Sequence, residues 1–328
     1  MKISIINQEL IKEVYTMADA IQANKDALSI YSKGGANIPL RTNIDIPEQA
    51  GQSLYMPGYA ADADALGVKI VSVYPNNIEK NIPSVPSTMV LIDPETGQVN
   101  ALIDGTYLTQ MRTGAVAGAG TDILARKDSK IFTIFGTGGQ AEEQVAAVLD
   151  VREIEKVYVC DLNQERSLDF ATRMAAKHNI EFVVAPSVEE AVSNADIITC
   201  VTTTTRPLFP ADLVQPGTHI NGIGSYTPQM QEIGADVLIK AGGVYCDTVD
   251  GVINEAGDLM IPLADKIVTE DIIKGELGQV INGEVIGRTS EEEITIFKST
   301  GSAVLDVVNA RRIYEKAIES EKVTSISI

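Results

Sequence analysis

The sequence predicts an α/β protein with a doubly wound parallel sheet, joined to a second domain of the α+β class. From Lys130 onward, apolar runs rich in β-branched residues alternate with amphipathic helical segments, which is typical of parallel strands connected by helices. A glycine-rich turn directly follows the first of these runs. The first 120 or so residues differ, because their apolar residues alternate with period two, as in antiparallel strands.

In the second part, helices are expected at 142–151, from Asn163 to about His178, and in a short segment opened by Ser187. Ser187 and Glu190 have the spacing of a capping box. The apolar runs between these helices predict strands at 130–135, 156–161, 181–185, 196–202 and 218–224.

The first part begins with a helical stretch over 8–34. Alternating runs follow at 53–59, 66–74 and 87–104, and the last contains a hairpin turn at 93–97. A helix rich in Ala, Gly and Thr is expected from Tyr107 to Ala125, and a final helix from Ala303 to about Glu319 is expected to pack on the first domain. The predicted domains are 1–118 with 304–328, for substrate binding and dimerisation, and 119–303, for dinucleotide binding.

Composition restricts the function. The 328 residues are 45% hydrophobic, which suffices for two domains, and the formal net charge of −19 would repel nucleic acids and anionic membranes. No apolar stretch approaches the roughly 20 residues of a membrane span, so a cytoplasmic protein is expected. Cys160, Cys200 and Cys246 lie far apart in apolar runs and are expected to be buried free thiols. With only two histidines, we expect neither a metal site nor a serine–histidine triad.

The glycine-rich turn has the spacing of a dinucleotide-binding site. Gly136, Gly138 and Ala141 form a G-x-G-x-x-A motif between a strand and a helix. Gly136 permits a tight turn, Gly138 allows the backbone to approach a pyrophosphate, and Ala141 allows close packing of helix on strand. The alternative is a glycine turn that binds another ligand or none.

Asp161 adds a second marker. It ends the next predicted strand, about 20 residues beyond the motif, where a carboxylate accepts hydrogen bonds from the adenosine ribose. Because this charge repels a 2′-phosphate, the expected cofactor is NAD (NADH). Arg166 lies a few residues further on, so NADP remains possible.

Three cations in the first domain stand among apolar or small residues: Arg41, Lys69 and Arg112. A buried cation needs an opposite charge, and a substrate carboxylate would provide one. The alternative is that each side chain reaches solvent or pairs with one of the many acidic residues.

Six segments together resemble the ornithine cyclodeaminase/mu-crystallin family over nearly the whole chain. They are PLRTNI (39–44), GVKIVSVYPNN (67–77), DGTYLTQMRTGAVAGAGTDILAR (104–126), GTGGQAEEQ (136–144), GTHINGIGSYTP (217–228) and IFKSTGSAVLDVVNA (296–310). The resemblance implies a homodimer of subunits that each carry a Rossmann domain, with the first domain forming the substrate site and the subunit interface.

The resemblance also implies roles for individual residues. Arg41 and Arg112 would bind the substrate carboxylate, with Lys69 near the reacting end, Tyr226 at the substrate, and Lys69, Arg112 and Ser225 as catalytic residues. The implied cofactor contacts are Thr113, Gly136, Thr137, Gly138, Gln140 and Asp161, with Thr202 and Thr203 on the adenosine side and Ile223, Ser299 and Gly301 on the nicotinamide side.

One position departs from part of the family. Cyclodeaminases and alanine dehydrogenases of the family carry an aspartate where this chain has Tyr226. Without that carboxylate, a cationic amine lacks a partner and a base. The loop is more similar to that of the imine reductases, so the expected activity is reduction of Δ1-pyrroline-2-carboxylate or Δ1-piperideine-2-carboxylate to proline or pipecolate.

Three alternatives remain open. Ornithine cyclodeaminase would convert L-ornithine to proline and ammonia with bound NAD, and would need another acid, for which Glu232 is nearby in sequence. The second alternative is an alanine dehydrogenase or an amino-acid coupling dehydrogenase. The third is a non-catalytic protein that binds the cofactor and a small ligand, since a fold alone does not fix function.

Overall fold

The computed structural model describes residues 2–80 and 82–328. Its contacts divide the chain into two compact units, Met1–Arg112 with Ser302–Ile328, and Thr113–Gly301. The domain limits predicted from the sequence, 118/119 and 303/304, lie a few residues from these. No helix in the described part of the chain is long and apolar enough to span a membrane.

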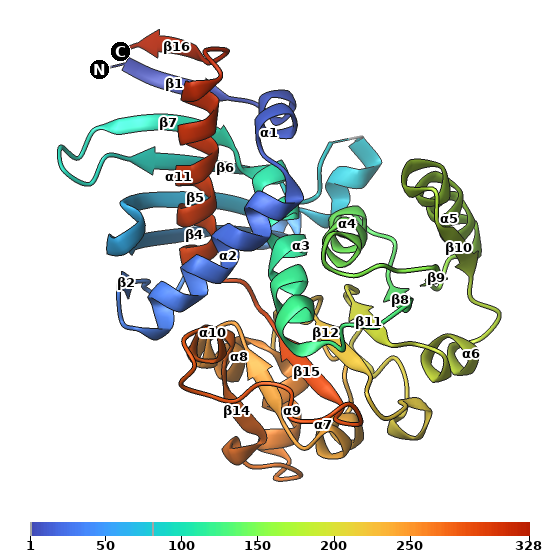
Figure 1. The fold of residues 1–328 in the computed structure, drawn as a ribbon. Helices are drawn as coiled ribbons and strands as arrows, with labels where there is room; N and C mark the ends of the chain where they lie inside the picture. The colour runs from blue at the N-terminus through green and yellow to red at the C-terminus, as the bar shows by residue number, and fades with distance from the viewer. Residues whose placement is uncertain (1, 81) are drawn as a thin grey trace. The chain divides into compact units, whose positions relative to one another are not determined.

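The second unit is built on a parallel sheet (Figure 1). Its strand order is β10 (Glu181–Val184), β9 (Lys156–Cys160), β8 (Ile131–Phe135), β11 (Ile197–Cys200), β12 (His219–Gly222), β15 (Thr295–Lys298), β13 (Val244–Cys246) and β14 (Ile273–Glu276). The chain passes outward from β8 to β10 and then returns to β11 on the other side of β8. This reversal is the switch point of a doubly wound sheet, and the predicted fold class is confirmed.

The helices of this unit begin and end where local signals indicate. Asn163 caps α5 (Gln164–His178) by accepting a hydrogen bond from the Arg166 N–H at 3.0 Å, and the Ser187 hydroxyl accepts one from the Glu190 N–H at 3.1 Å at the start of α6 (Val188–Ser193). The other helices are α4 (Ala141–Val151), α7 (Ala235–Ala241), α8 (Val249–Glu255), α9 (Gly257–Ala264) and α10 (Leu277–Ile281), with 3-10 turns η4 (Ala211–Leu213) and η5 (Glu270–Ile272).

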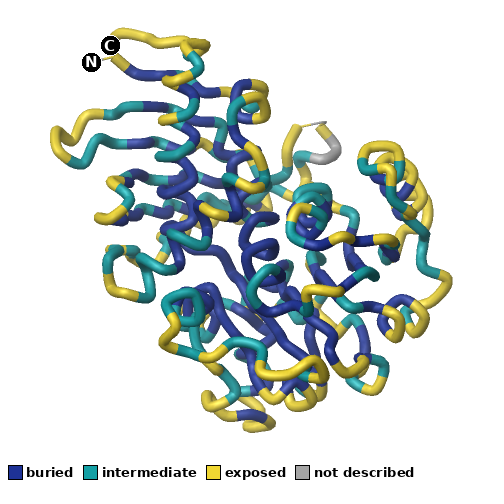
Figure 2. Tube along the Cα trace, viewed as in Figure 1, coloured by how far each residue is buried: buried dark blue, intermediate teal, exposed yellow. Residues whose placement is uncertain are grey.

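The inner strands β8, β11, β12, β13 and β15 are almost entirely buried, whereas the edge strands β10 and β14 are partly exposed (Figure 2). Val145 and Val148 of α4 pack with Phe170 of α5 against β8 and β9. Leu238 of α7 and Leu259 of α9 belong to a second cluster over β11, β12 and β15. Burial on both faces explains why these strands read as continuous apolar runs.

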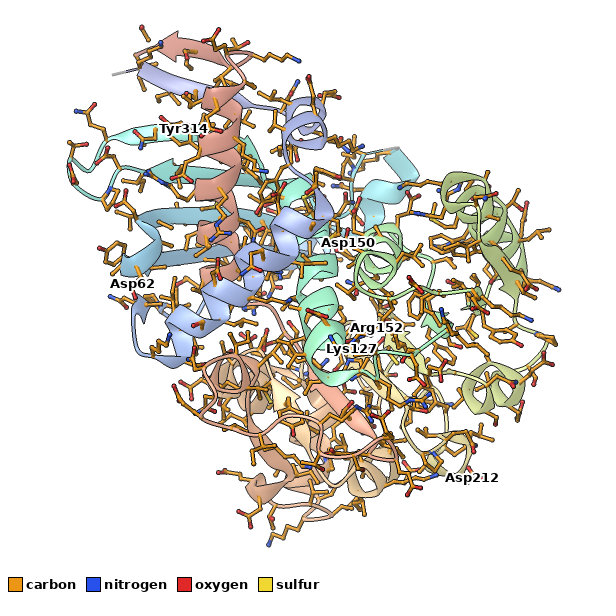
Figure 3. All side chains as sticks on the ribbon, viewed as in Figure 1. Asp62, Lys127, Asp150, Arg152, Asp212 and Tyr314 are labelled. Atoms are coloured by element: carbon orange, nitrogen blue, oxygen red, sulfur yellow. The ribbon has the colours of Figure 1, made fainter. Side chains whose placement is uncertain are left out.

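Helix α3 (Gly105–Leu124) includes residues of both units. Arg152 donates hydrogen bonds to the carbonyls of Thr121 at 2.8 Å and of Asp122 and Ala125 at 3.0 Å, and Lys127 donates to Asp122 (Figure 3). These cations place hydrogen-bond donors at the carboxyl end of α3, where the last carbonyls of a helix lack intrahelical partners.

The first unit contains an antiparallel meander that continues into one parallel pair. The strand order is β16 (Thr324–Ser327), β1 (Lys2–Ile6), β7 (Val99–Asp104), β6 (Ser87–Ile92), β5 (Ala65–Val73), β4 (Gly51–Ala60) and β2 (Ala36–Asn37), with β3 (Thr42–Ile46) also paired to β4. Strands β4 to β7 are antiparallel as predicted, whereas β1 is parallel to β7. The long connection between β1 and β7, which includes two helices, makes parallel pairing possible.

Two long helices pack on this sheet. The predicted helical start is interrupted at Tyr15 and Thr16, which separate α1 (Gln8–Val14) from α2 (Met17–Ser32), and Thr16 forms a capping box with Asp19. Helix α11 (Ala303–Glu319) lies beside α2 and crosses strands β4 to β6 (Figure 1). The remaining turns are η1 (Pro47–Gln49), η2 (Ala61–Ala63) and η3 (Pro75–Lys80).

Candidate cofactor and substrate sites

The predicted cofactor residues of the second unit gather at the carboxyl edge of its parallel sheet. Gly136 follows β8, Asp161 follows β9, Thr202 lies just beyond β11, Ile223 follows β12 and Ser299 follows β15. Because these strands are parallel neighbours, their carboxyl ends meet at one edge. Doubly wound sheets bind dinucleotides at this edge, next to the switch point.

The glycine turn fits a pyrophosphate. Gly136 has a φ of +100°, and a Cβ atom there would lie 2.7 Å from the Val201 carbonyl oxygen, so only glycine fits. At Gly138, a Cβ would meet no described atom within 4 Å, so this backbone faces open space. Gln140 makes no capping bond to α4 in the described chain, and its buried Oε1 has no hydrogen-bond partner there. An anion at the start of α4 therefore meets uncapped N–H groups.

Asp161 is connected to the same turn. Its carboxylate accepts hydrogen bonds from the Thr137 N–H at 2.9 Å, the Thr137 hydroxyl at 2.7 Å and the Asn163 N–H at 3.0 Å. Burial raises the pKa of Asp161, but these hydrogen bonds outweigh burial and lower it, so the side chain is ionised at neutral pH.

Thr113 lies close to the start of α4. A Cβ on the neighbouring Gly114 would be 2.3 Å from the Glu143 carbonyl oxygen, so α3 directly contacts the first turn of α4. The role of Thr113 near the cofactor phosphates stays a prediction.

The loops after β11 and β12 meet at Glu232, whose role the sequence left open. The Glu232 side chain is fully buried and accepts hydrogen bonds from the Thr202 N–H at 2.5 Å and the Gly224 N–H at 2.7 Å. Because its carboxylate already accepts hydrogen bonds from backbone N–H groups, Glu232 is a poor substitute for the family aspartate. Thr203, by contrast, is exposed.

Ser225 and Tyr226 differ in environment. Ser225 is fully buried, and its hydroxyl donates a hydrogen bond to the Met230 carbonyl at 2.7 Å. This contact supports a role in shaping the loop, and the catalytic role expected from the family resemblance stays a prediction. Tyr226 is half-buried.

Asp247, which the sequence analysis missed, organises the segment after β15. Its carboxylate accepts hydrogen bonds from the Ser299 hydroxyl at 2.6 Å and the Gly301 N–H at 2.9 Å. Burial raises the pKa of Asp247. The sequence contains a signal for Asp247. The apolar run VYCD ends in this aspartate, just as the run VYVCD ends in Asp161.

In the first unit, three charged side chains from different elements form a buried cluster. Lys69 of β5 lies 2.8 Å from Asp306 of α11, and the Arg112 Nε of α3 lies 2.9 Å from the same carboxylate. Lys69 is 1% exposed and Asp306 is 0% exposed. Met56 and Met89 flank Lys69 on the neighbouring strands and are also buried.

The cluster lowers the pKa of Lys69. Burial is the main cause, the positive charges of Arg112 and Arg41 add to it, Asp306 opposes it, and the resulting pKa is about 7. Of the three predicted cations, Lys69 and Arg112 share the Asp306 carboxylate, and Arg41 acts on Lys69 through its charge. Asp306 was missed by the sequence analysis, although an acid inside the apolar run AVLDVV is itself a signal.

Amide side chains fix the backbone of Arg112. Asn24 of α2 donates a hydrogen bond to the Arg112 carbonyl at 2.7 Å, and Asn309 of α11 donates to Asn24 at 2.7 Å. The Tyr15 hydroxyl completes this buried network with a 3.0 Å bond to Asn309. The cation is therefore held by packed helices rather than by a loop.

A doubly wound sheet with this glycine turn and acid is the architecture of dinucleotide-binding proteins. The sequence pattern of the ornithine cyclodeaminase/mu-crystallin family matches residues 2–321, and the chain belongs to this family.

Named relatives cover nearly the whole chain. It is 37% identical over 308 residues to a Δ1-pyrroline-2-carboxylate reductase from Bacillus cereus, covering 94% of each protein. The structure of Thermococcus litoralis Δ1-pyrroline-2-carboxylate reductase in complex with NADH and L-proline matches with a TM-score of 0.95 and 38% identity, covering 99% of this chain and all of that one. An archaeal alanine dehydrogenase dimer with bound NAD matches with a TM-score of 0.93 and 33% identity, with full coverage of both chains.

Proposed function

We propose that this chain is an NAD(H)-dependent reductase of a cyclic imino acid, with Δ1-pyrroline-2-carboxylate as the first candidate substrate and Δ1-piperideine-2-carboxylate as the second. The observation that carries the proposal is the buried cluster of Lys69, Arg112 and Asp306. The names of the B. cereus and T. litoralis relatives support the same reaction.

The charges of the cluster suit a small monoanion. With all groups ionised, two cations face one carboxylate, so a single positive charge remains, and Arg41 adds another. A substrate carboxylate supplies the missing negative charge. Arg112 uses Nε on Asp306, and the other nitrogens of its guanidinium provide the planar donor pair that carboxylates prefer.

Reduction of a C=N bond requires a hydride at carbon and a proton at nitrogen. When bound, NADH supplies the hydride equivalent. Lys69 is suited to provide the proton, because a pKa near 7 makes its ammonium a strong enough acid while leaving it protonated in much of the population at neutral pH. Asp306 positions this donor and receives no proton itself.

The same residues argue against deamination of a free amino acid. That reaction needs a carboxylate near the substrate amine, and the family position for it holds Tyr226. Glu232, the alternative acid, is engaged by backbone N–H groups. We therefore propose reduction rather than cyclodeamination, with NADH preferred over NADPH because of Asp161 and, by analogy with the alanine dehydrogenase neighbour, a homodimer.

The proposal is tested by following NADH oxidation with each of the two imino acids at neutral pH. Parallel reactions measure ammonia release from L-ornithine with NAD and NADH formation from L-alanine. We expect rapid NADH loss with an imino acid and neither ammonia nor NADH in the controls. Turnover of ornithine or alanine without imine reduction would reject the proposal, and cofactor binding without any turnover would favour a ligand-binding role.

A further inference from the structure

We propose that Glu232 is a positioning residue of the cofactor site, and that its carboxylate sets NADH affinity by joining the loop after β11 to the loop after β12. The inference rests on the proposed function only in naming NADH as the ligand. It concerns a residue outside the dinucleotide motif and all of its geometry lies within the second unit.

Each oxygen of the Glu232 carboxylate serves one loop. Oε1 accepts hydrogen bonds from the N–H and the hydroxyl of Thr202, at 2.5 and 2.8 Å. Oε2 accepts them from the N–H groups of Gly224 and Ser225, at 2.7 and 3.0 Å. A single side chain therefore satisfies three backbone donors and one hydroxyl from two separate loops.

The two loops are in direct contact at this point. A Cβ on Gly224 would lie 2.1 Å from the Thr202 carbonyl oxygen, so a side chain cannot be accommodated there. The Ile223 N–H donates to the Cys200 carbonyl at 2.9 Å and continues the pairing of the two strands. Without an acceptor for the N–H groups of Thr202 and Gly224, the loops would have to separate to reach water.

These loops carry predicted cofactor contacts. Thr202 is expected on the adenosine side and Ile223 on the nicotinamide side, and both lie at the carboxyl edge of the sheet. A change in the spacing of the loops therefore alters contacts at two places along the dinucleotide. This is why we expect the connection through Glu232 to affect affinity as well as folding.

Glu232 is itself fixed by a buried ion pair. Asp258 of α9 accepts hydrogen bonds from the Glu232 and Ile233 N–H groups, at 2.6 and 3.0 Å. The Lys298 ammonium of β15 lies 3.1 Å from Asp258 and donates to the Gly222 carbonyl at 3.0 Å. Glu232, Asp258 and Lys298 are all 0% exposed, so this network is part of the packed interior.

The charges around Glu232 make its ionisation sensitive to pH near neutrality. The pKa of Glu232 is raised to about 7, mainly by burial and then by the Asp258 carboxylate, while Lys298 and the Thr202 donors oppose this rise. The Cys200 thiol of β11 also faces the group, and burial raises the pKa of that thiol far above its usual value. Only the ionised carboxylate accepts all four hydrogen bonds, since a proton on either oxygen would compete with them.

Affinity and stability should consequently respond to pH in opposite directions. As pH falls through about 7, Glu232 gains a proton, the connection weakens and NADH affinity falls. For folding, the pKa is higher in the folded than in the unfolded chain, so the contribution of Glu232 is fully present below its unfolded pKa and is lost as pH rises toward about 7. A purely structural residue would change stability without this trend in affinity.

The test measures the dissociation constant of NADH by fluorescence titration from pH 8.5 to 5.5, for the wild type and Glu232→Gln. We expect the wild-type constant to rise by up to about tenfold per pH unit below about 7. Glu232→Gln presents an amide N–H₂ to one pair of donors, so its constant should be raised about tenfold at pH 8, equivalent to about 1.4 kcal/mol, and should lack the wild-type trend.

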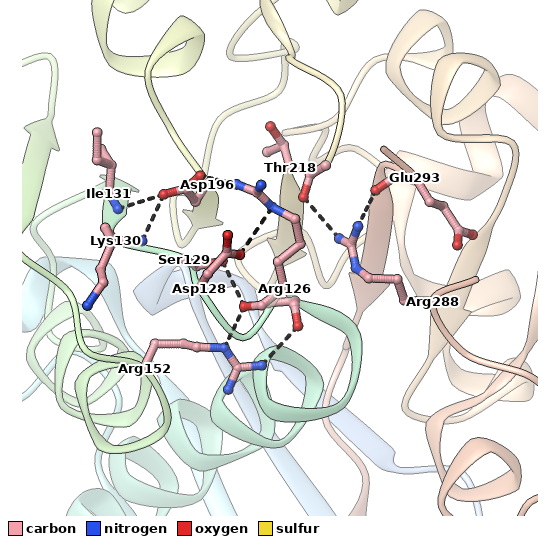
Figure 4. A network of polar contacts seen from close by, with 12 residues as sticks. Arg126, Asp128, Ser129, Lys130, Ile131, Arg152, Asp196, Thr218, Arg288 and Glu293 are labelled. Atoms are coloured by element: carbon pink, nitrogen blue, oxygen red, sulfur yellow. Dashed lines mark hydrogen bonds and ion pairs between the residues drawn. The ribbon is translucent and has the colours of Figure 1, made fainter. Parts of the chain in front are cut away.

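Asp196 provides a matched control in the same unit (Figure 4). Its carboxylate also joins backbone segments, accepting hydrogen bonds from the Lys130 and Ile131 N–H groups at 2.8 and 2.9 Å and pairing with Arg126. It precedes β11 and therefore lies at the amino edge of the sheet, opposite the cofactor residues. Asp196→Asn should lower the unfolding temperature, because it removes hydrogen bonds that stabilise the folded chain. The NADH dissociation constant should stay within about twofold of the wild-type value, because these bonds lie away from the cofactor residues.

Each outcome decides the proposal. It is overturned if Glu232→Gln binds NADH as the wild type does, or if Asp196→Asn loses as much affinity for an equal loss of stability. If the Gln variant does not fold, a wild-type dissociation constant that is constant from pH 8.5 to 5.5 overturns it instead. A wild type that does not bind NADH at all rejects the proposed function as well, whereas normal wild-type binding with an unaffected variant rejects this inference only.

Discussion

The ammonium of Lys69 lies 2.8 Å from both carboxylate oxygens of Asp306, in the interior of the first unit. Two buried partners of opposite charge normally stabilise each other's ionised forms. Here burial and the charge of Arg112 nevertheless keep the pKa of Lys69 down at about 7. Asp306 thus holds the side chain in place without preventing it from losing its proton.

The first prediction concerns the pH dependence of imine reduction. If Lys69 donates the proton, kcat/KM should be constant below about pH 7 and should fall about tenfold per unit above it, because only the ammonium form is active. Initial rates between pH 5.5 and 9.5, measured with the imino acid varied and NADH kept saturating at every pH, provide the measurement.

Lys69→Met is the companion variant, since it keeps the length of the side chain and its apolar neighbours Met56 and Met89. Its kcat/KM should fall by about 10²- to 10⁴-fold. The decrease of kcat/KM above about pH 7, which we call the alkaline limb of the profile, should be absent. If the same limb persists in this variant, it belongs to the substrate or another group, and Lys69 is not the donor.

The second prediction concerns Asp306→Asn. Removing this charge leaves Lys69 and Arg112 buried without their shared partner, which should lower the free energy of unfolding by about 3–5 kcal/mol. Because Asp306 raises the pKa of Lys69, the alkaline limb of kcat/KM should also move to lower pH. Urea denaturation and the pH profile measure the two effects separately.

Asp64→Asn serves as the control, because Asp64 follows η2 and pairs with a cation of the same helix α11. Asp64 pairs with Arg311 of α11 at 3.0 Å but its side chain is 56% exposed, so its loss should change stability by about 0–1 kcal/mol and leave the pH profile unaltered. Equal effects of the two substitutions would mean that burial of the Lys69–Asp306 pair has no special importance.

Local patterns were sufficient to predict much of this molecule. The glycine turn at Gly136, the acid at Asp161 and the alternating runs around Lys69 are each visible within a short window of sequence. Strand β1 was not predicted, because its pairing with β7 joins residues almost one hundred positions apart and depends on tertiary packing.

The acidic residues whose structural roles were not predicted share one property. Asp306, Glu232 and Asp247 act through partners that are distant in sequence, on other elements of the fold. Propensity and spacing report neighbours along the chain, whereas a buried carboxylate is explained only by the cation or N–H groups that packing brings to it. An acid within an apolar run is the sequence signal common to Asp306 and Asp247.

The third prediction is a preference for NADH over NADPH. Asp161 is ionised at neutral pH and lies beside the glycine turn, so a 2′-phosphate on the ribose would meet a like charge. We expect NADH to bind about 10- to 100-fold more tightly than NADPH, equivalent to about 1.4–2.8 kcal/mol. Asp161→Asn should reduce this ratio mainly by improving NADPH binding, and an unchanged ratio would assign the preference to other residues.

The last prediction separates the two glycines of the turn. Gly136→Ala places a Cβ 2.7 Å from the Val201 carbonyl oxygen at a φ of +100°, so it should destabilise the fold by at least about 1–3 kcal/mol. Gly138→Ala meets no described atom within 4 Å and should leave the unfolding temperature within about 2 °C of the wild type. Its methyl group would instead occupy the space needed by the pyrophosphate and raise the NADH dissociation constant about tenfold or more. Thermal denaturation and NADH titration of both variants test this contrast, and a stable Gly138→Ala protein with wild-type affinity would show that the dinucleotide does not approach the backbone at this turn.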